Sequence, residues 1–237
     1  MKLYMDSAHR YGESPFIYPI YGLGGIPESF SRKCAVYGGT FMLNVKITRI
    51  EIGKPHKIWG VYEGKENWVT ADEIITHPNY LVGLGMESKL RFVGTVVRII
   101  CIINGRINGI SKSHNAVQII IPQKQTGRKN DIYIMMMGAS HGVSKKGFNV
   151  AVVSSILEKE DVFQDLKPAL DIVGKAEHVF VQREKMYSPV DKKFGDRLFI
   201  TDTLDETSHF ESATNNILEL YNKITGKKLD LDIEKMK

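Results

Sequence analysis

The sequence has few cysteines, no Asn-x-Ser/Thr acceptor and no apolar run long enough to span a membrane. Cys34 and Cys101 are the two cysteines among its 237 residues, and both have apolar neighbours. This pattern favours reduced thiols in the core rather than a disulfide scaffold. The longest apolar run, residues 93–103, contains Arg98 and falls well short of the ~20 residues that a membrane-spanning helix needs. With Asp6 near its start, the chain also does not open like a signal peptide.

The sequence also lacks a basic cluster of the kind that binds nucleic acid. Its formal net charge is +5, but the Lys and Arg residues are spread along the chain. Small basic groups at 124–129 and 145–146 lie beside glycines and are typical of solvated turns. Nucleic-acid binding usually needs clustered cations interleaved with stacking aromatics. We therefore expect no nucleic-acid partner, and at most a weak attraction to acidic proteins or anionic lipid headgroups.

Motifs for catalysis and cofactor binding are equally scarce. Residues 22–25 (GLGG) do not begin a dinucleotide-binding fingerprint, because the third glycine position of that motif holds Pro27. Successive histidines are more than twenty positions apart, so no local zinc pattern exists. His209 and Asp205 are close enough in sequence to suggest acid–base chemistry, but a histidine in the first turn of a helix more often packs or hydrogen-bonds there. We expect no catalytic residues, no metal and no cofactor.

Short strands dominate the regular pattern. β-Branched and aromatic runs separated by glycines and polar turns predict strands at 45–52, 58–62, 68–70, 74–76, 93–103, 117–121, 131–138 and 149–156. Residues 131–138 and 149–156 are expected to pair antiparallel, with Met135, Met136 and Met137 filling the core. Helices are expected at 2–11, 165–174 and 179–186. Since regular βαβ alternation is missing, the fold class is α+β, with a mixed, largely antiparallel sheet and flanking helices.

The last predicted helix has the clearest boundaries. Ser208 and Glu211 match a capping box, in which the two side chains satisfy backbone N–H groups at the start of a helix. Gly226 is placed to end it. One helical face is apolar; its members are Phe210, Ala213, Ile217, Leu220, Tyr221 and Ile224.

Residues 29–44 (SFSRKCAVYGGTFMLN) combine an arginine, aromatics, a glycine pair and a Phe-Met pair. Arginine and aromatic side chains supply much of the binding energy of protein interfaces, and methionine adapts to varied apolar surfaces. Gly38 and Gly39 let the backbone turn sharply, which would present the side chains that follow. The segment is therefore predicted to bind another protein.

The same region begins a series of blocks that resembles the Rab GDP-dissociation inhibitor family. The blocks are 18–24, 32–44, 98–102, 118–123, 127–133 and 207–211, in family order and spacing. The resemblance implies a large domain with an incomplete FAD/NAD(P)-binding-like fold that has lost cofactor function. It also implies that residues 1–12 are the end of the small helical lipid-binding domain. Residues 13–237 would then be the C-terminal part of the large domain.

The resemblance implies a function as well. The family binds GDP-bound prenylated Rab GTPases, slows GDP release, extracts Rab from membranes and recycles it in vesicle traffic. Such a protein would be cytoplasmic, cycling to membranes with transient membrane contact. Two alternatives stay open: a Rab escort protein that presents Rab for geranylgeranylation, and a fragment of a flavin-dependent oxidoreductase. A chain without the first parallel strands would expose apolar sheet edge and favour self-association.

The family's Rab-binding platform maps onto Arg32, Thr40, Phe41 and Met42. Arg32 would supply charge-assisted hydrogen bonds, and Met42 apolar contact to a switch region of Rab. Gly25 stands where the family commonly has Glu, so this chain would lack one polar contact to Rab.

The family's mobile membrane-recruitment loop maps onto Arg10, Tyr11, Ser14, Pro15 and Phe16. Phe16 replaces the usual Tyr and lacks its hydroxyl, and the loop differs from the family pattern in charge as well.

Overall fold

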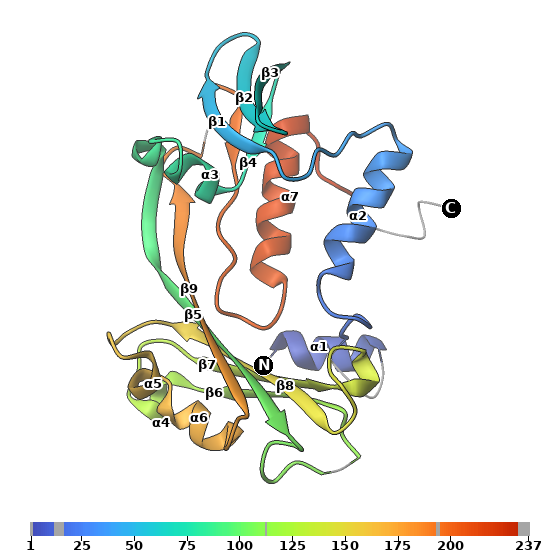
Figure 1. Cartoon of the computed structure of the whole chain (residues 1–237), viewed down its shortest axis with the longest axis vertical. Helices are drawn as coiled ribbons and strands as arrows, with labels where there is room; N and C mark the ends of the chain where they lie inside the picture. Colours follow the sequence, from blue (N-terminus) through green and yellow to red (C-terminus); the bar gives the residue numbers. More distant parts are fainter. Residues whose placement is uncertain (1, 12–16, 112, 193–194, 232–237) are drawn as a thin grey trace.

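Residues 2–11, 17–111, 113–192 and 195–231 are described by a computed structural model, which shows β-sheets flanked by short helices (Figure 1). The strands are β1 (Lys46–Glu51), β2 (His56–Tyr62), β3 (Lys65–Ala71), β4 (Ile74–Thr76), β5 (Leu90–Asn104), β6 (Ala116–Ile121), β7 (Ile132–Gly138), β8 (Phe148–Ile156), β9 (His178–Pro189) and β10 (Leu198–Ile200). The α-helices are α1 (Lys2–Tyr11), α2 (Gly25–Val36), α3 (Pro78–Val82), α4 (Gln123–Thr126), α5 (Val162–Asp165), α6 (Lys167–Val173) and α7 (Glu211–Thr225), with 3-10 turns η1 (Glu87–Lys89) and η2 (Ala139–His141).

The strands form an antiparallel sheet β1-β2-β3, a parallel pair β4-β10 and an antiparallel sheet of order β6-β7-β8-β5-β9. In Figure 1 the five-stranded sheet lies at the lower end and the three-stranded sheet at the upper end, joined by the long strands β5 and β9. This arrangement confirms the predicted α+β class with a mixed, largely antiparallel sheet.

The main hydrophobic core lies on the five-stranded sheet. From Val97 onward β5 buries every second side chain, including Ile99 and Cys101, as expected for a sheet with one face packed. Helices α5 and α6 cover that face with the buried Val162 and Ala169, and Leu166, between the two helices, is buried there as well. A second, smaller core joins the β4–β10 pair to α7; its buried members are Leu81, Leu90, Leu198, Phe199, Ile200 and Leu220.

The predicted strands are confirmed, with ends shifted by no more than three residues. Residues 93–103 form the middle of β5, an interior strand, and β7 pairs antiparallel with β8. Met136 and Met137 are buried as expected, whereas Met135 is only half-buried. The predicted helix at 2–11 is α1.

The helix predicted at 179–186 is wrong, because these residues belong to β9. This strand pairs with β5 from His178 to Pro189, with one register shift. Val179, Phe180 and Val181 are residue types that favour strands, and the long ladder with β5 decides the conformation.

The capping box predicted at Ser208 and Glu211 is also wrong. Helix α7 begins at Glu211, and Phe210 at its N-cap position has no side chain that could make the capping hydrogen bond. The Ser208 hydroxyl accepts a hydrogen bond from the side-chain amide of Gln118 instead. The predicted end at Gly226 is confirmed, with φ at 70°.

The helix predicted at 165–174 is two short helices, α5 and α6. Asp161 caps α5 by accepting hydrogen bonds from the backbone N–H groups of Phe163 and Gln164. Pro168 lies in the first turn of α6 and Gly174 ends it, both as expected.

Candidate protein-binding surface

Helix α2 has no buried residue in its twelve positions. Pro27 lies in its first turn, where the missing N–H is not needed, and Glu28 faces the positive end of the helix dipole. Glycine and proline disfavour helix in a sequence pattern, and because Gly24, Gly25 and Pro27 stand at the start of α2, this helix is not among those predicted. Because Cys34 lies on α2, it is exposed, so the expectation of a core thiol is wrong there. Cys101 is buried as expected, and burial raises the pKa of its thiol.

The chain turns back on α2 at the glycine pair. Gly38 has φ at +89°, a conformation that favours glycine. The Gly39 N–H donates to the carbonyl of Cys34 at 3.0 Å, and a Cβ at Gly39 would collide with Cys34 Sγ. After this turn Phe41 is 51% exposed and Met42 60% exposed. The predicted presentation of these side chains is confirmed.

The residues expected to form the platform fall into two groups. Gly25 begins α2, and Arg32 lies seven residues later, two turns along the same side and ~10 Å further on the axis. Thr40, Phe41 and Met42 follow the glycine turn and are exposed. Within the described parts of the chain, the Arg32 guanidinium has no hydrogen bond or ion pair, so it is available to a partner.

Further exposed apolar side chains surround these residues. We name residues 17–43 the arm; its exposed large apolar residues are Ile17, Ile20, Tyr21, Leu23, Phe30, Val36, Tyr37, Phe41, Met42 and Leu43. Isolated surface hydrophobes are ordinary, but such a gathering indicates an interaction surface. Sequence reasoning missed Phe30, although the four-residue spacing of Ile26, Phe30 and Cys34 is a helical signal.

The base of the arm is fastened to the turn after β7. The Tyr21 N–H donates to the carbonyl of His141 at 2.7 Å. The ring of Tyr18 packs edge-on against that of His141, with centroids 5.7 Å apart. A Cβ on Gly142 would lie 2.6 Å from the Tyr21 ring, so only glycine admits this contact. In Figure 1 α2 accordingly rises from the η2 end of the large sheet along the side of the molecule.

The residues expected in the membrane-recruitment loop are only partly described. Arg10 and Tyr11 end α1, whereas Ser14, Pro15 and Phe16 lie outside the described residues. Among the helices of the described ranges, none has the length and apolarity to cross a membrane.

Asp205 and His209 hold the start of α7. Asp205 accepts hydrogen bonds from the hydroxyls of Thr207 and Ser212, and His209 Nδ1 accepts from the backbone N–H of Glu211. Arg98 donates to the Asp205 carbonyl at 2.8 Å. In the described part of the chain, no group of three or more His, Cys, Asp or Glu residues could hold a metal ion.

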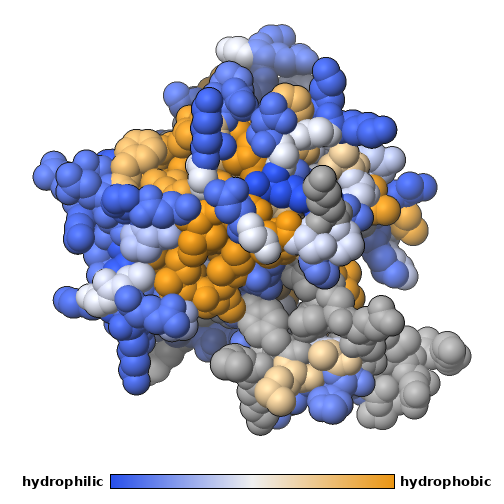
Figure 2. Space-filling model, turned by 90° about the horizontal axis from the view of Figure 1, so that it is seen from below, coloured by the Kyte–Doolittle hydropathy of each residue, from blue (hydrophilic) through white to orange (hydrophobic). Residues whose placement is uncertain are grey.

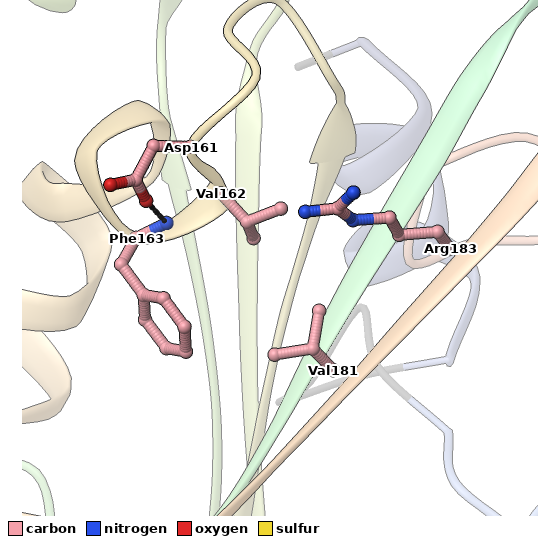
Figure 3. A pocket seen from close by; sticks show the side chains of 5 residues that line it. All are labelled: Asp161, Val162, Phe163, Val181 and Arg183. Atoms are coloured by element: carbon pink, nitrogen blue, oxygen red, sulfur yellow. Dashed lines mark hydrogen bonds between the residues drawn. The ribbon is translucent and has the colours of Figure 1, made fainter.

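A shallow hollow of about 590 Å³ lies between α5 and β9, far from the arm in sequence. Figure 3 shows Val162, Phe163 and Val181 around it, with Arg183 reaching in from β9. Asp161, also in its wall, is engaged in capping α5. One cation and a hydrophobic wall can hold a side chain, but they form no catalytic set.

The fold matches known structures. The crystal structure of Rab GDI from Plasmodium falciparum has a TM-score of 0.87 and 39% identity, covering 97% of this chain and 51% of that one. The p-nitrophenol 4-monooxygenase PnpA from Pseudomonas putida has a TM-score of 0.54 at 9% identity, covering 92% of this chain and 56% of that one; this likeness shows the fold alone.

Sequence comparison gives the same family. Guanosine nucleotide diphosphate dissociation inhibitor 2 of Arabidopsis thaliana is 40% identical over 99% of this chain and 51% of its own length. Rab GDP dissociation inhibitor beta of Rattus norvegicus is 36% identical over 100% of this chain and 52% of its own. The chain thus spans about half the length of the curated relatives it matches. The family model "GDI: GDP dissociation inhibitor" matches residues 1–236, and the chain belongs to this family.

Proposed function

We propose that this chain carries part of the Rab-binding surface of a GDP dissociation inhibitor that holds prenylated Rab GTPases in the GDP-bound state. The complete activity would slow GDP release, extract Rab from membranes and return it, as a cytoplasmic regulator rather than an enzyme. Family membership and the names of the relatives support this proposal. We assign residues 1–12 to the end of a helical lipid-binding domain and 13–237 to the large domain.

The observation that carries the proposal is the unburied arm. A helix without buried residues, followed by exposed Phe41, Met42 and Leu43, gains little from the fold it belongs to. Arginine and large apolar side chains are the residue types that anchor interfaces. We assign Arg32 to a charge-assisted contact with Rab, and Thr40, Phe41 and Met42 to the surface beside it.

The binding test compares point variants with neighbours on the same surface. Arg32→Ala and Met42→Ala should each weaken binding to GDP-loaded Rab about tenfold or more, which corresponds to ~1.4 kcal/mol or more. Lys33→Ala, one residue along the exposed helix, and Val190→Ala, an exposed apolar residue outside the arm, are the controls. Release of a fluorescent GDP analogue from Rab, with and without the protein, gives the readout.

The proposal predicts equal circular dichroism spectra for all four variants and slower GDP release with the parent and both controls. It is wrong if the parent chain leaves GDP release unchanged, or if Arg32→Ala and Met42→Ala slow it as well as the parent does. Prenylated Rab on liposomes then tests extraction separately, because extraction also needs a site for the lipid.

Gly25 offers a test by gain of function. A Cβ at Gly25 has no atom within 4 Å, so a side chain can begin there without a clash. We expect Gly25→Glu to strengthen Rab binding by restoring the carboxylate that the family commonly has. Gly24→Glu, also with open space, adds the same charge about 100° around the helix. Equal gains from both variants would mean that only the added charge matters.

A further inference from the structure

Exposed apolar side chains are not confined to the arm. Figure 2, which views the molecule from the lower end of Figure 1, shows hydrophobic residues gathered there inside a hydrophilic border. Exposure alone therefore does not define a binding surface; the direction in which its side chains are presented matters as well. Helix α2 has no buried residue, so its direction depends on the contacts that the chain makes at the two ends of the arm.

The two ends of the arm meet different parts of the molecule. Beyond its far end the chain enters β1, and a Cβ on Gly60 of β2 would lie 2.8 Å from Val45 Cγ1, so the side chain of Val45 covers that glycine. At the base, two tyrosines contact the turn that follows β7. We name this contact the latch; its residues are Tyr18, Tyr21, His141 and Gly142.

The latch holds Tyr21 in a backbone conformation that bulky residues rarely adopt. Its φ is 69°, in the left-handed region, which costs free energy unless the surroundings enforce it. Two contacts do so. The Tyr21 N–H donates to the His141 carbonyl at 2.7 Å, and the Tyr21 ring lies against Gly142, itself left-handed with φ at +66°. The chain then turns at Gly22 into α2, so the latch fixes the path by which the helix begins.

Tyr18 joins the body to the start of α2 through a single side chain. Its ring packs edge-on against His141 of the body. Burial raises the pKa of its phenol, although a hydrogen bond with the backbone of Leu23, just before the helix, acts in the opposite direction. A Cβ on Gly22 would lie 3.8 Å from the Tyr18 hydroxyl and 3.7 Å from Val143 Cγ1, so both sides of the latch close around this turn.

We propose that the latch sets the direction in which α2 presents Arg32 to Rab, and that His141 and Gly142 are positioning residues for Rab binding although they lie outside the arm. This inference rests on the proposed function. Helix α2 has twelve residues and is therefore ~18 Å long, so a change of ~10° at its base would move its far end by ~3 Å. A hydrogen-bonded contact does not tolerate such a shift.

Substitution of Gly142 tests the geometry of the full chain. In Gly142→Ala the new methyl group would collide with the Tyr21 ring, since a Cβ there lies 2.6 Å from it. Spin labels on the exposed Cys34 of α2 and on Lys124→Cys of α4 report the distance between the arm and the sheet, while the buried Cys101 stays unlabelled. We expect one narrow distance maximum for the parent, and a shifted or broadened one for Gly142→Ala.

Gly226→Ala is the matched control. Gly226 ends α7 with φ at 70°, close to that of Gly142, but a Cβ there has no atom within 4 Å. Both substitutions place alanine in a left-handed conformation, so both should lower the midpoint of urea unfolding to a similar extent. Only Gly142→Ala should change the label distance. An unchanged distance in Gly142→Ala, or the same change in Gly226→Ala, overturns the inference.

Rab binding is then measured with the same two variants by the release of a fluorescent GDP analogue. Gly142→Ala should weaken binding about tenfold or more, and Gly226→Ala should bind like the parent. If Gly142→Ala moves the helix yet binds Rab like the parent, the latch does not position the Rab surface and the inference is wrong, while the proposed function stands. If the parent itself leaves GDP release unchanged, the proposed function fails, and the label distances still show whether the latch directs α2.

A double variant tests whether Gly142 acts through the Tyr21 ring. Tyr21→Gly removes the ring and suits the left-handed backbone. In this background Gly142→Ala has no ring to collide with, so we expect it to cause no further change in label distance or in Rab binding. If the two substitutions instead multiply in their effects on binding, Gly142 acts by a route other than the ring contact, and the latch as defined here is wrong.

Discussion

The five-stranded sheet and the arm differ in what holds them in place. The sheet packs against the fully buried Ile99, Ile134 and Leu166, and side-chain hydrogen bonds of Asp165 fasten α5 to it. The arm has a regular helix without a buried residue and is fastened mainly at its base, through Tyr18 and Tyr21. Regular backbone structure alone therefore does not mark the stable part of this protein. The sheet carries the folding stability, and the arm carries exposed side chains suited to a partner.

A buried ion pair joins the last residue of α5 to the turn before β7. Arg128 and Asp165 form an ion pair with side chains 6% and 0% exposed. The guanidinium also donates to the Ile156 carbonyl at 2.6 Å and to Ser155 Oγ at 3.2 Å. Asp165 in turn accepts from the backbone N–H of Glu158 at 2.9 Å. The network ties the α4–β7 turn to the end of β8 and to α5.

Removing one partner of this pair should give the largest loss of stability. Asp165→Ala removes the fully buried counter-charge of Arg128 and leaves it only the Glu158 carboxylate, 3.6 Å away, so we expect a loss of ~3 kcal/mol in the free energy of unfolding. Asp171→Ala breaks an exposed pair with Lys167, which should cost less than ~0.5 kcal/mol. Urea unfolding followed by circular dichroism measures both. Similar losses would show that burial does not distinguish the two pairs.

Apolar truncations should separate the sheet from the arm directly. Ile134→Ala removes a fully buried side chain from β7, so we expect a loss of ~2–5 kcal/mol. Phe30→Ala removes a larger side chain from α2 that is 72% exposed, and should change stability by less than ~0.5 kcal/mol. The same urea titration serves. A loss for Phe30→Ala close to that of Ile134→Ala would mean that the arm packs against the body or a second copy in solution.

The same difference explains what could be predicted from the sequence. Strands of the sheet are visible because each needs alternating or continuous apolar residues to meet the core. The arm has no core to meet, so α2 shows only the short spacing of Ile26, Phe30 and Cys34, and the apolar neighbours of Cys34 wrongly indicate an interior thiol. The helix expected over residues 179–186 is wrong because the partner that makes this segment a strand, β5, lies about eighty residues earlier in the chain. The platform positions came from family resemblance, since nothing in the spacing of Arg32 and Met42 defines a surface.

The smallest expected effect concerns two carboxylates near α7 whose pKa values shift in opposite directions. Burial raises the pKa of Glu206, helped by the nearby charges of Asp205 and Asp131. A hydrogen bond from Lys223, together with its charge, lowers the pKa of Glu219. The folded state therefore favours protonated Glu206 and ionised Glu219.

The two glutamates should therefore give opposite pH dependences on substitution by glutamine. The folded chain binds the Glu206 proton more tightly than the unfolded chain does. Stability therefore falls as the pH rises from the ordinary pKa of glutamate through the raised pKa of Glu206 in the folded chain. Glu206→Gln should match the parent at low pH and exceed it in stability above that window.

Glu219 stabilises the folded chain above its ordinary pKa and loses this contribution as the pH falls through its lowered pKa in the folded chain. Glu219→Gln should therefore be less stable than the parent at neutral pH and converge with it in acid. Urea unfolding from pH ~3 to ~8, which brackets the ordinary glutamate pKa, measures both differences. Parallel curves for the two variants would show that neither carboxylate is perturbed as its surroundings imply.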